Sequence, residues 1–393
     1  MNFNKIIQPT SIKIFSIRMR KNLVLSVQSI ITVLASISLN LISFANDGAF
    51  YANGNQLIPI TESKISVKKE ILLIERVNSE YLRIHVHYEF FNPGADKKVL
   101  TGFEAVSPSG DVDGTPRNGK HPYIYDFSAK VNGELIATNV AIVHDSLYYQ
   151  NEKFNTVSDT EINNISDINN VDFKYVYYFE PLFKKGITTI DHSYLLKLSG
   201  SVDLKYNFTY VLTAATRWAN QQIDDFTLIL DLGDFQHYYI PKTFFENDLS
   251  WAHVGQGKIN SMLDSRLYQD GISALEVITQ SGQLIFQQSN FKPTDELSIY
   301  AWNFFGGCEN FNPAHCDLPF EIDDTQFIGQ PVDEMAKKIL RNLPFARRGY
   351  IFKNAELQAY YMRMHWYIPN QNYEALPELL TEQEKSWIEK FSE

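Results

Sequence analysis

The chain has 393 residues and a formal net charge of −11, with 46 acidic against 35 Lys and Arg residues. Residues 1–45 hold five of the basic residues and no acidic one, so the remainder carries 30 basic against 46 acidic residues, a net charge near −16. Such a charge repels phosphate backbones and anionic lipid surfaces. It therefore argues against nucleic acid as a partner.

Residues 1–45 have the composition of a secretory signal peptide. The basic stretch precedes an apolar run over residues 23–42, and Ser43-Phe44-Ala45 follows it. Polar residues interrupt the run, which disfavours a membrane anchor, so we expect cleavage after Ala45 and no membrane span afterwards. Translation begins either at Met1 or at Met19, and Met19 gives the usual signal-peptide proportions. The sequence thus predicts an exported protein, periplasmic or extracellular.

Residues 46 to about 328 are rich in tyrosine, phenylalanine and β-branched residues with a period of two. Residues 81–91 show it best, because apolar and polar side chains alternate throughout. Turn signals separate such segments, at 92–94, 132–133, 199–200, 233–234 and 281–282. We predict strands of antiparallel β-sandwiches at 65–74, 81–91, 204–212, 226–232, 275–279 and 297–302.

An asparagine-rich stretch suggests a division within this β-region. Residues 151–170 show little periodicity and read as a linker or long loop. We predict one β-sandwich domain over 46–150 and a second over 171–320, because about 350 residues exceed one ordinary core. The alternative is that the stretch is an excursion within one larger β-domain. The overall expectation is an α+β multidomain chain.

Residues 325–393 predict a small helical domain. Apolar residues recur at helical spacing before Gly349, which suits a left-handed helix end. Pro344 predicts a kink or an early end of this helix. Asn354 can cap a second helix over 355–364, and Thr381 with Glu384 forms a capping box for a third.

The segment Phe345-Ala346-Arg347-Arg348-Gly349 resembles the core of the YARHG domain, a module of bacterial extracytoplasmic proteins. Further matches are Arg341-Asn342, Phe352, Glu356-Leu357, Tyr360 and Trp366-Tyr367. Phe345 and Arg348 replace the tyrosine and histidine of the family pattern, and Pro344 replaces an apolar helix former. The β-region is similar to uncharacterised secreted proteins that carry such a module, through residues 46–51, 54–59, 88–93 and 102–104. These resemblances imply export but no catalytic residue.

Two patterns could bind metal ions. His85 and His87 project from the same face of one predicted strand and could hold zinc or copper if an acidic residue or a third histidine approached. An exposed strand face carries such residues more often without a metal. Asp111 and Asp113 lie before Gly114 in a glycine-containing loop that could bind calcium, although the later glutamate of an EF-hand is missing. An acidic turn is the simpler interpretation.

Cys308 and Cys316 are the two cysteines, and we predict a disulfide between them worth about 2 to 3 kcal/mol. The alternatives are a reactive thiol beside His315 or a metal site formed by these three residues. A second group of residues could bind a carboxylate of peptidoglycan or of an envelope protein. Its members are Arg341, Arg347, Arg348, Trp366 and Tyr367. Ion pairing for the arginines and core packing for the aromatic residues are the simpler interpretations.

The sequence contains no serine-hydrolase elbow, zinc-protease motif, Walker A loop or dinucleotide fingerprint. We therefore favour a non-catalytic exported protein that binds or scaffolds in the bacterial envelope. Two alternatives are a metal-assisted envelope hydrolase using His85 and His87, and a structural assembly subunit. No cofactor is expected beyond the calcium or zinc considered above.

Overall fold

The computed structural model describes residues 50–51, 53–55, 57–60, 64–144, 148–266, 271–306, 308–323 and 328–392. The predicted signal peptide, its cleavage after Ala45 and the choice between Met1 and Met19 lie outside these residues. Residues 46–393 form one compact unit. Within the described ranges, no helix is both long and apolar enough to cross a membrane.

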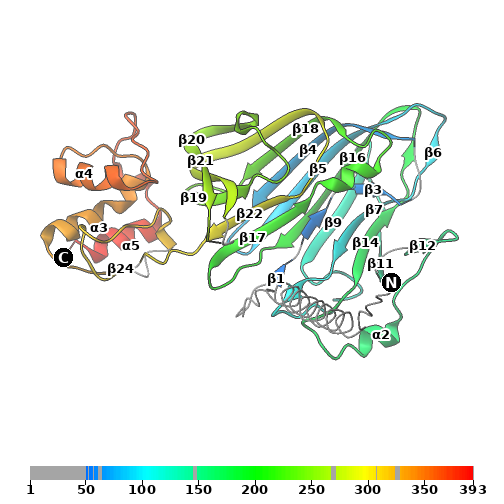
Figure 1. Ribbon diagram of the computed structural model, residues 1–393, viewed down its shortest axis with the longest axis horizontal. Helices are drawn as coiled ribbons and strands as arrows, with labels where there is room; N and C mark the ends of the chain where they lie inside the picture. Colours follow the sequence, from blue (N-terminus) through cyan, green and yellow to red (C-terminus); the bar gives the residue numbers. More distant parts are fainter. Residues whose placement is uncertain are drawn as a thin grey trace, which may run out of the picture. The chain divides into compact units, whose positions relative to one another are not determined.

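A large sheet of twelve strands dominates the β-region (Figure 1). Neighbouring strands are mostly antiparallel; β18 beside β4 and β2 beside β17 are parallel. The order along the sheet is β10 (Glu134–Ile136), β9 (Ile124–Val131), β16 (Gly186–Lys197), β5 (Tyr81–Asn92), β4 (Ser66–Arg76), β18 (Ile223–Asp231), β21 (Ile272–Phe291), β19 (Gln236–Pro241), β22 (Leu297–Trp302), β17 (Leu204–Val211) and β2 (Asn53–Asn55), with β20 (Trp251–Asp264) paired to β21.

A second sheet covers part of the large one. Its four strands, in order, are β11 (Asn139–Val143), β14 (Lys174–Phe179), β7 (Thr101–Val106) and β3 (Leu57–Pro59). Aromatic side chains of the two sheets meet in the main core: the ring centroids of Phe103 and Tyr194 are 4.8 Å apart, and those of Phe127 and Tyr177 are 4.9 Å apart. The predicted mainly antiparallel sandwich is therefore confirmed.

Short strand pairs and helical turns complete the sandwich and the carboxyl-terminal part of the chain. Four two-stranded pairs join β1 (Phe50–Tyr51) to β8 (Ser109–Gly110), β12 (Tyr149–Gln150) to β13 (Lys153–Phe154), β15 (Leu182–Phe183) to β6 (Lys97–Lys98), and β23 (Cys308–Phe311) to β24 (Ile328–Pro331). Short helical turns are α2 (Asp159–Asn163), η1 (Thr213–Arg217), η2 (Asp248–Ser250) and η4 (Pro377–Leu379).

The ranges 46–150 and 171–320 share one sheet instead of forming two sandwiches. Strand β16, from the second range, lies between β9 and β5 of the first, and β18 pairs with β4. The small sheet likewise takes β14 from the second range. The structure follows the alternative in which 151–170 is an excursion within one β-region. Alternation predicted the faces of these strands, but it carries no information about which strand lies beside which.

The longest hairpin bends at a pair of glycines. Residues 281–282, predicted as a turn, lie inside the 20-residue strand β21, where Gly282 is opposite Gly255 of β20. Both have positive φ, and an added Cβ would approach a backbone oxygen to 2.1 Å at Gly282 and 2.3 Å at Gly255. The turn prediction here was wrong, because the glycines serve close backbone approach at the bend. The predicted turn at Asn132-Gly133 is confirmed between β9 and β10, with φ of 51° and 85°.

The carboxyl-terminal helices form a separate hydrophobic cluster, in which α3 (Glu334–Arg347), α4 (Ala355–Arg363) and α5 (Glu382–Lys390) gather (Figure 1). Helix α3 runs past Pro344 instead of ending early, and Gly349 follows it with φ of 81°. Hydrogen bonds from Gly349 N to Ala346 O and from Tyr350 N to Phe345 O complete a Schellman motif. The predicted caps of α4 and α5 are both present.

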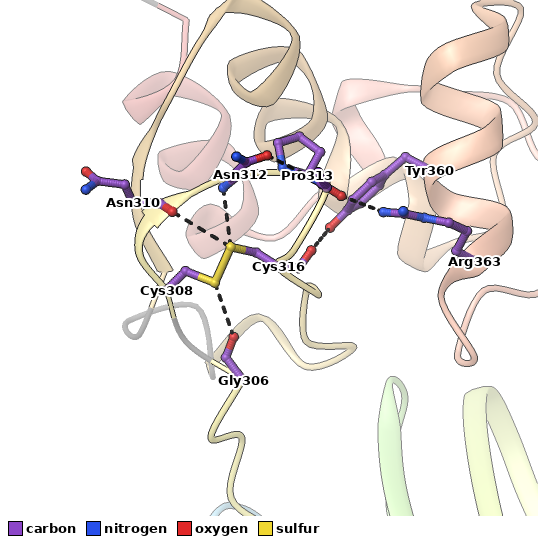
Figure 2. The surroundings of a disulfide bond; sticks show 9 residues. Gly306, Cys308, Asn310, Asn312, Pro313, Cys316, Tyr360 and Arg363 are labelled. Atoms are coloured by element: carbon purple, nitrogen blue, oxygen red, sulfur yellow. Dashed lines mark hydrogen bonds between the residues drawn. A yellow bond between two sulfur atoms is a disulfide. The ribbon is translucent and has the colours of Figure 1, made fainter.

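The predicted disulfide between Cys308 and Cys316 is present (Figure 2). Because both sulfurs are bonded to each other, neither is a free thiol or a thiolate metal ligand. The loop that it closes is tied to α4, since Tyr360 Oη donates to Cys316 O at 3.0 Å and Arg363 Nη2 donates to Pro313 O at 2.6 Å. The disulfide therefore fixes the segment that leads into the helical domain.

Candidate functional site: a cavity between the sheet and the helical domain

A cross-strand row of polar side chains lies on one face of the large sheet. His237 and Tyr239 are two residues apart on β19, so they share a face. Glu276 of β21 is directly opposite Tyr239, and Asn260 of β20 is directly opposite Glu276. The register of three strands thus places an imidazole, a phenol, a carboxylate and an amide side by side.

The helical domain adds a second imidazole to this row. Helix α4 ends at Arg363. Trp366 fixes the chain that follows the helix, because its Nε1 donates to Leu318 O at 2.7 Å. Gln280 Nε2 donates to Ile368 O at 3.3 Å, which ties this chain to β21. As a result His365 Nε2 lies 3.7 Å from Glu276 Oε1.

His237, Glu276 and His365 form a compact group in which one ligand atom of each lies within 4.8 Å of the others. His237 Nε2 is 3.0 Å from Glu276 Oε1, and Asn260 Nδ2 donates to Glu276 Oε2 at 2.9 Å. Tyr239 Oη is 2.9 Å from His237 Nε2. Asn260 therefore orients the carboxylate so that its other oxygen faces both imidazoles.

The charges of this group follow from its surroundings. Burial acts to raise the pKa of Glu276, but the hydrogen bonds from His237 and Asn260 and the nearby imidazoles outweigh it and lower the pKa to about 2. Burial, with the charge of His237, lowers the pKa of His365, although Glu276 opposes this shift. At neutral pH the site therefore holds a carboxylate beside a neutral imidazole of His365.

An ion pair between the exposed Arg266 and the buried Asp264 lies next to this group. Arg266 makes two hydrogen bonds of 2.8 Å to the carboxylate of Asp264, whose exposed fraction is 1%. Its guanidinium carbon lies 4.7 Å from the ring centroid of Tyr239 and 4.6 Å from that of Trp302. Burial acts to raise the pKa of Asp264, but the hydrogen bonds from Arg266 and Trp302 outweigh it and lower it to about 2. Arg266 thus packs against the Tyr239 and Trp302 rings, which form an aromatic wall beside the group.

These groups line a cavity of about 560 Å³ between the sheet and the helical domain. Six aromatic residues contribute to its wall: Tyr239, Trp302, Phe304, Phe305, Phe320 and Trp366. A cavity of this size with an apolar wall and a few convergent polar groups is the usual form of a small-molecule site. It is the strongest candidate site among the described residues.

His85 and His87 lie elsewhere, on β5, beside a smaller cavity of about 450 Å³. An acidic residue does approach, since Asp191 of β16 is opposite His87 and its Oδ1 lies 2.7 Å from His87 Nδ1. His85 does not join them in a group of three ligand atoms among the residues described. The zinc or copper site at His85 and His87 stays a prediction.

Asp111 and Asp113 both accept hydrogen bonds, Asp113 within its own loop and Asp111 from a residue of another loop. Asp113 Oδ1 accepts from the backbone and hydroxyl of Thr115, and Asp111 Oδ1 accepts from Asn169 Nδ2 at 3.0 Å. The bonds between Asp113 and Thr115 are those of an acidic turn. Calcium binding there stays a prediction.

The carboxyl-terminal residues that we considered for binding are mostly engaged inside the domain. Arg347 and Arg348 both donate to Glu384 Oε1. Trp366 is buried, and Tyr367 Oη donates to Tyr350 O at 2.6 Å. The remaining member, Arg341, is half-buried on α3. Of the five residues only Trp366 contributes to the cavity wall, and a binding role for any of the five stays a prediction.

Comparisons with known proteins identify the helical domain. Among curated protein sequences, none matches the chain. Similar solved structures include a proposed nutrient-binding protein of Legionella pneumophila (16% identity, 87% of this chain and 99% of that one, TM-score 0.45) and an M1 zinc metallopeptidase of Deinococcus radiodurans (8% identity, 61% and 43%, TM-score 0.20). A third is baculovirus P35 (9% identity, 61% and 97%, TM-score 0.22). These TM-scores lie below 0.5, so the similarities assign neither fold nor function. Residues 331–393 match the sequence model of the YARHG domain, and this chain therefore carries a carboxyl-terminal YARHG domain after its β-rich region.

Proposed function

We propose that the protein is an exported, non-catalytic binding protein of the bacterial envelope, and that it holds a small organic ligand in the cavity between the sheet and the YARHG domain. The cavity of about 560 Å³ carries this proposal. Its aromatic wall suits a planar or apolar part of a ligand, while the guanidinium of Arg363, which also lines the cavity, suits a carboxylate. Peptidoglycan fragments, which carry peptide carboxylates, belong to this class of ligand.

Export is supported by three observations of different kinds. Residues 1–45 have the composition of a signal peptide. The disulfide between Cys308 and Cys316 suits an oxidising compartment. The YARHG match points to a module of extracytoplasmic proteins. Fractionation of the producing cells, with detection of the processed chain, tests this part of the proposal.

Ligand binding is tested by calorimetric titration of the purified chain with soluble peptidoglycan fragments, in the presence of a metal chelator. We expect saturable binding that weakens about threefold to tenfold in Phe305→Ala, because this side chain lines the cavity and offers apolar area to a ligand. Its 64% exposed fraction makes a folding defect from the substitution a small concern.

Leu249→Ala is the matched control, since Leu249 is 90% exposed and lies outside the cavity wall. It should bind as the unchanged chain does. Absence of saturable binding by any fragment, or equal binding by both variants, would contradict the proposed ligand class and place.

The metal-assisted hydrolase is a second candidate, favoured by the approach of Asp191 to His87. It requires a metal at His85 and His87, and hydrolysis of a supplied envelope substrate that stops in His87→Ala. Unchanged hydrolysis in that variant would remove this candidate.

A further inference from the structure

The group His237, Glu276 and His365 has the composition of a transition-metal site. Two imidazole nitrogens and one carboxylate oxygen suit Zn²⁺, Co²⁺, Ni²⁺ and Cu²⁺ much better than they suit calcium or magnesium, which prefer all-oxygen sites. The group differs from the pair at His85 and His87 because all three ligand atoms already lie within 4.8 Å of one another.

The distances fit a single bound ion. Ligand atoms placed about 2.0 to 2.2 Å from zinc lie roughly 3.3 to 3.5 Å from each other in a tetrahedral arrangement. Glu276 Oε1 is 3.0 Å from His237 Nε2 and 3.7 Å from His365 Nε2, and all three ligand atoms lie within 4.8 Å of one another. Side-chain movements of about 1 Å therefore suffice to bring them to these separations. The ion would replace the proton shared between His237 and Glu276.

Neighbouring side chains hold the ligands in place. Asn260 Nδ2 fixes Glu276 Oε2 at 2.9 Å, which leaves Oε1 for the ion. Tyr239 Oη, 2.9 Å from His237 Nε2 and 3.5 Å from Glu276 Oε1, lies close enough to bond a fourth ligand such as water. Such outer partners commonly alter metal affinity by about 10-fold to 100-fold.

The ligands come from both parts of the chain. His237 and Glu276 lie on adjacent strands of the sheet, whereas His365 follows α4 in the YARHG domain. An ion here would therefore join the sheet to the domain. Its remaining coordination position faces the cavity, because all three residues line that cavity.

We propose that His237, Glu276 and His365 bind one Zn²⁺ ion, with an open coordination position directed into the cavity. This metal site goes beyond the proposed ligand binding and does not depend on it. Each proposal can be refuted without the other, because the ligand titration contains a chelator and the metal titration contains no organic ligand.

The test is competition between the chelator-treated, dialysed full chain and a chromophoric zinc indicator, with zinc as the sole added metal. We expect one equivalent of zinc, bound with a dissociation constant of about 1 μM or tighter, and a loss of about 100-fold or more in His365→Ala. Cobalt substitution should give the intense visible absorption of a four-coordinate ion.

Two variants serve as controls. His315→Ala removes an exposed histidine from the disulfide loop, and the double substitution of His85 and His87 by alanine removes the other candidate pair. Both should keep full zinc affinity. The proposal is overturned if the chain binds no equivalent of zinc, if His365→Ala binds as tightly as the unchanged chain, or if the double variant is the one that loses zinc. Circular dichroism of His365→Ala, whose side chain is 61% exposed, verifies that the variant is folded.

Discussion

Replacing Glu384 by alanine should open the YARHG domain, because one carboxylate there balances two arginines. Glu384 and the Arg347 side chain are 1% and 4% exposed, and Arg347 Nη1 lies 2.7 Å from Glu384 Oε1. Burial lowers the pKa of Arg347 to about 10, although Glu384 opposes the shift, so the guanidinium stays charged at neutral pH. Removing one partner of a buried pair costs about 3 to 5 kcal/mol.

A second cost comes from the capping box, because Glu384 Oε2 also accepts from Thr381 N at 2.9 Å. Losing this contact adds about 1 kcal/mol, so we expect a total of about 4 to 6 kcal/mol. Glu384→Gln keeps an acceptor for Thr381 and removes the charge, so it should retain the smaller contribution and lose the larger one.

Hydrogen exchange followed by mass spectrometry on peptides from α3 and α5 measures this opening free energy locally. Glu382→Ala on the same helix is the matched control: its side chain is 90% exposed and pairs with exposed Lys385, so the change should stay within about 0.5 kcal/mol. If Glu384→Ala changes the opening free energy no more than Glu382→Ala does, then the loss of the Glu384 carboxylate does not leave a costly unpaired charge on Arg347.

Three further changes follow from the structure. Gly349→Ala should lower the free energy of unfolding in urea by about 1 to 3 kcal/mol or more, because φ is 81° and an added Cβ would lie 2.3 Å from a backbone oxygen. Gly94→Ala, where the nearest atom to an added Cβ is 3.5 Å away, should leave this free energy nearly unchanged. Replacing Cys308 and Cys316 by serine should cost about 2 to 3 kcal/mol and raise proteolysis of the loop, and an unchanged unfolding midpoint would contradict this. Burial lowers the pKa of His192 to about 3, so the unfolded chain binds its proton first and stability should fall as pH drops from about 6.5 towards 3. His192→Phe should reduce this fall, measured as the difference in urea midpoint between pH 7 and pH 5.

Local signals in the sequence predicted local structure well. Apolar residues alternate along β5, and every second side chain from Leu82 to Phe90 is buried. The caps at Asn354 and Thr381 are confirmed because a cap depends on residues within one helical turn. The sequence favours an ion pair for Arg347. It does not show that the partner is Glu384, the glutamate of the capping box of α5.

The candidate site could not be predicted in the same way. Glu276 lies in a strand that the sequence predicts, but the sequence predicts no strand around His237. His365 belongs to no motif, although it directly precedes Trp366 of the YARHG resemblance. Their proximity depends on the pairing of β19 with β21 and on the packing of the YARHG domain against that face. A sequence pattern does not show which strands pair or which face of the sheet a domain packs against. The two-residue spacing of His85 and His87, by contrast, is visible in the sequence.

The YARHG motif acts on the cavity through the backbone. Arg347 Nε donates to Phe320 O, and Trp366 Nε1 donates to Leu318 O. Two residues of the domain thus bind the backbone of the same segment, which lines the cavity. Gly349 O accepts from Asn370 N at 2.8 Å, which fixes the chain that follows Trp366. Arg347 and Gly349 do not line the cavity themselves, but they hold segments on either side of His365. Loss of the Glu384 carboxylate should therefore weaken zinc binding as well as the helices. The motif therefore need not meet a ligand itself to determine whether the site forms.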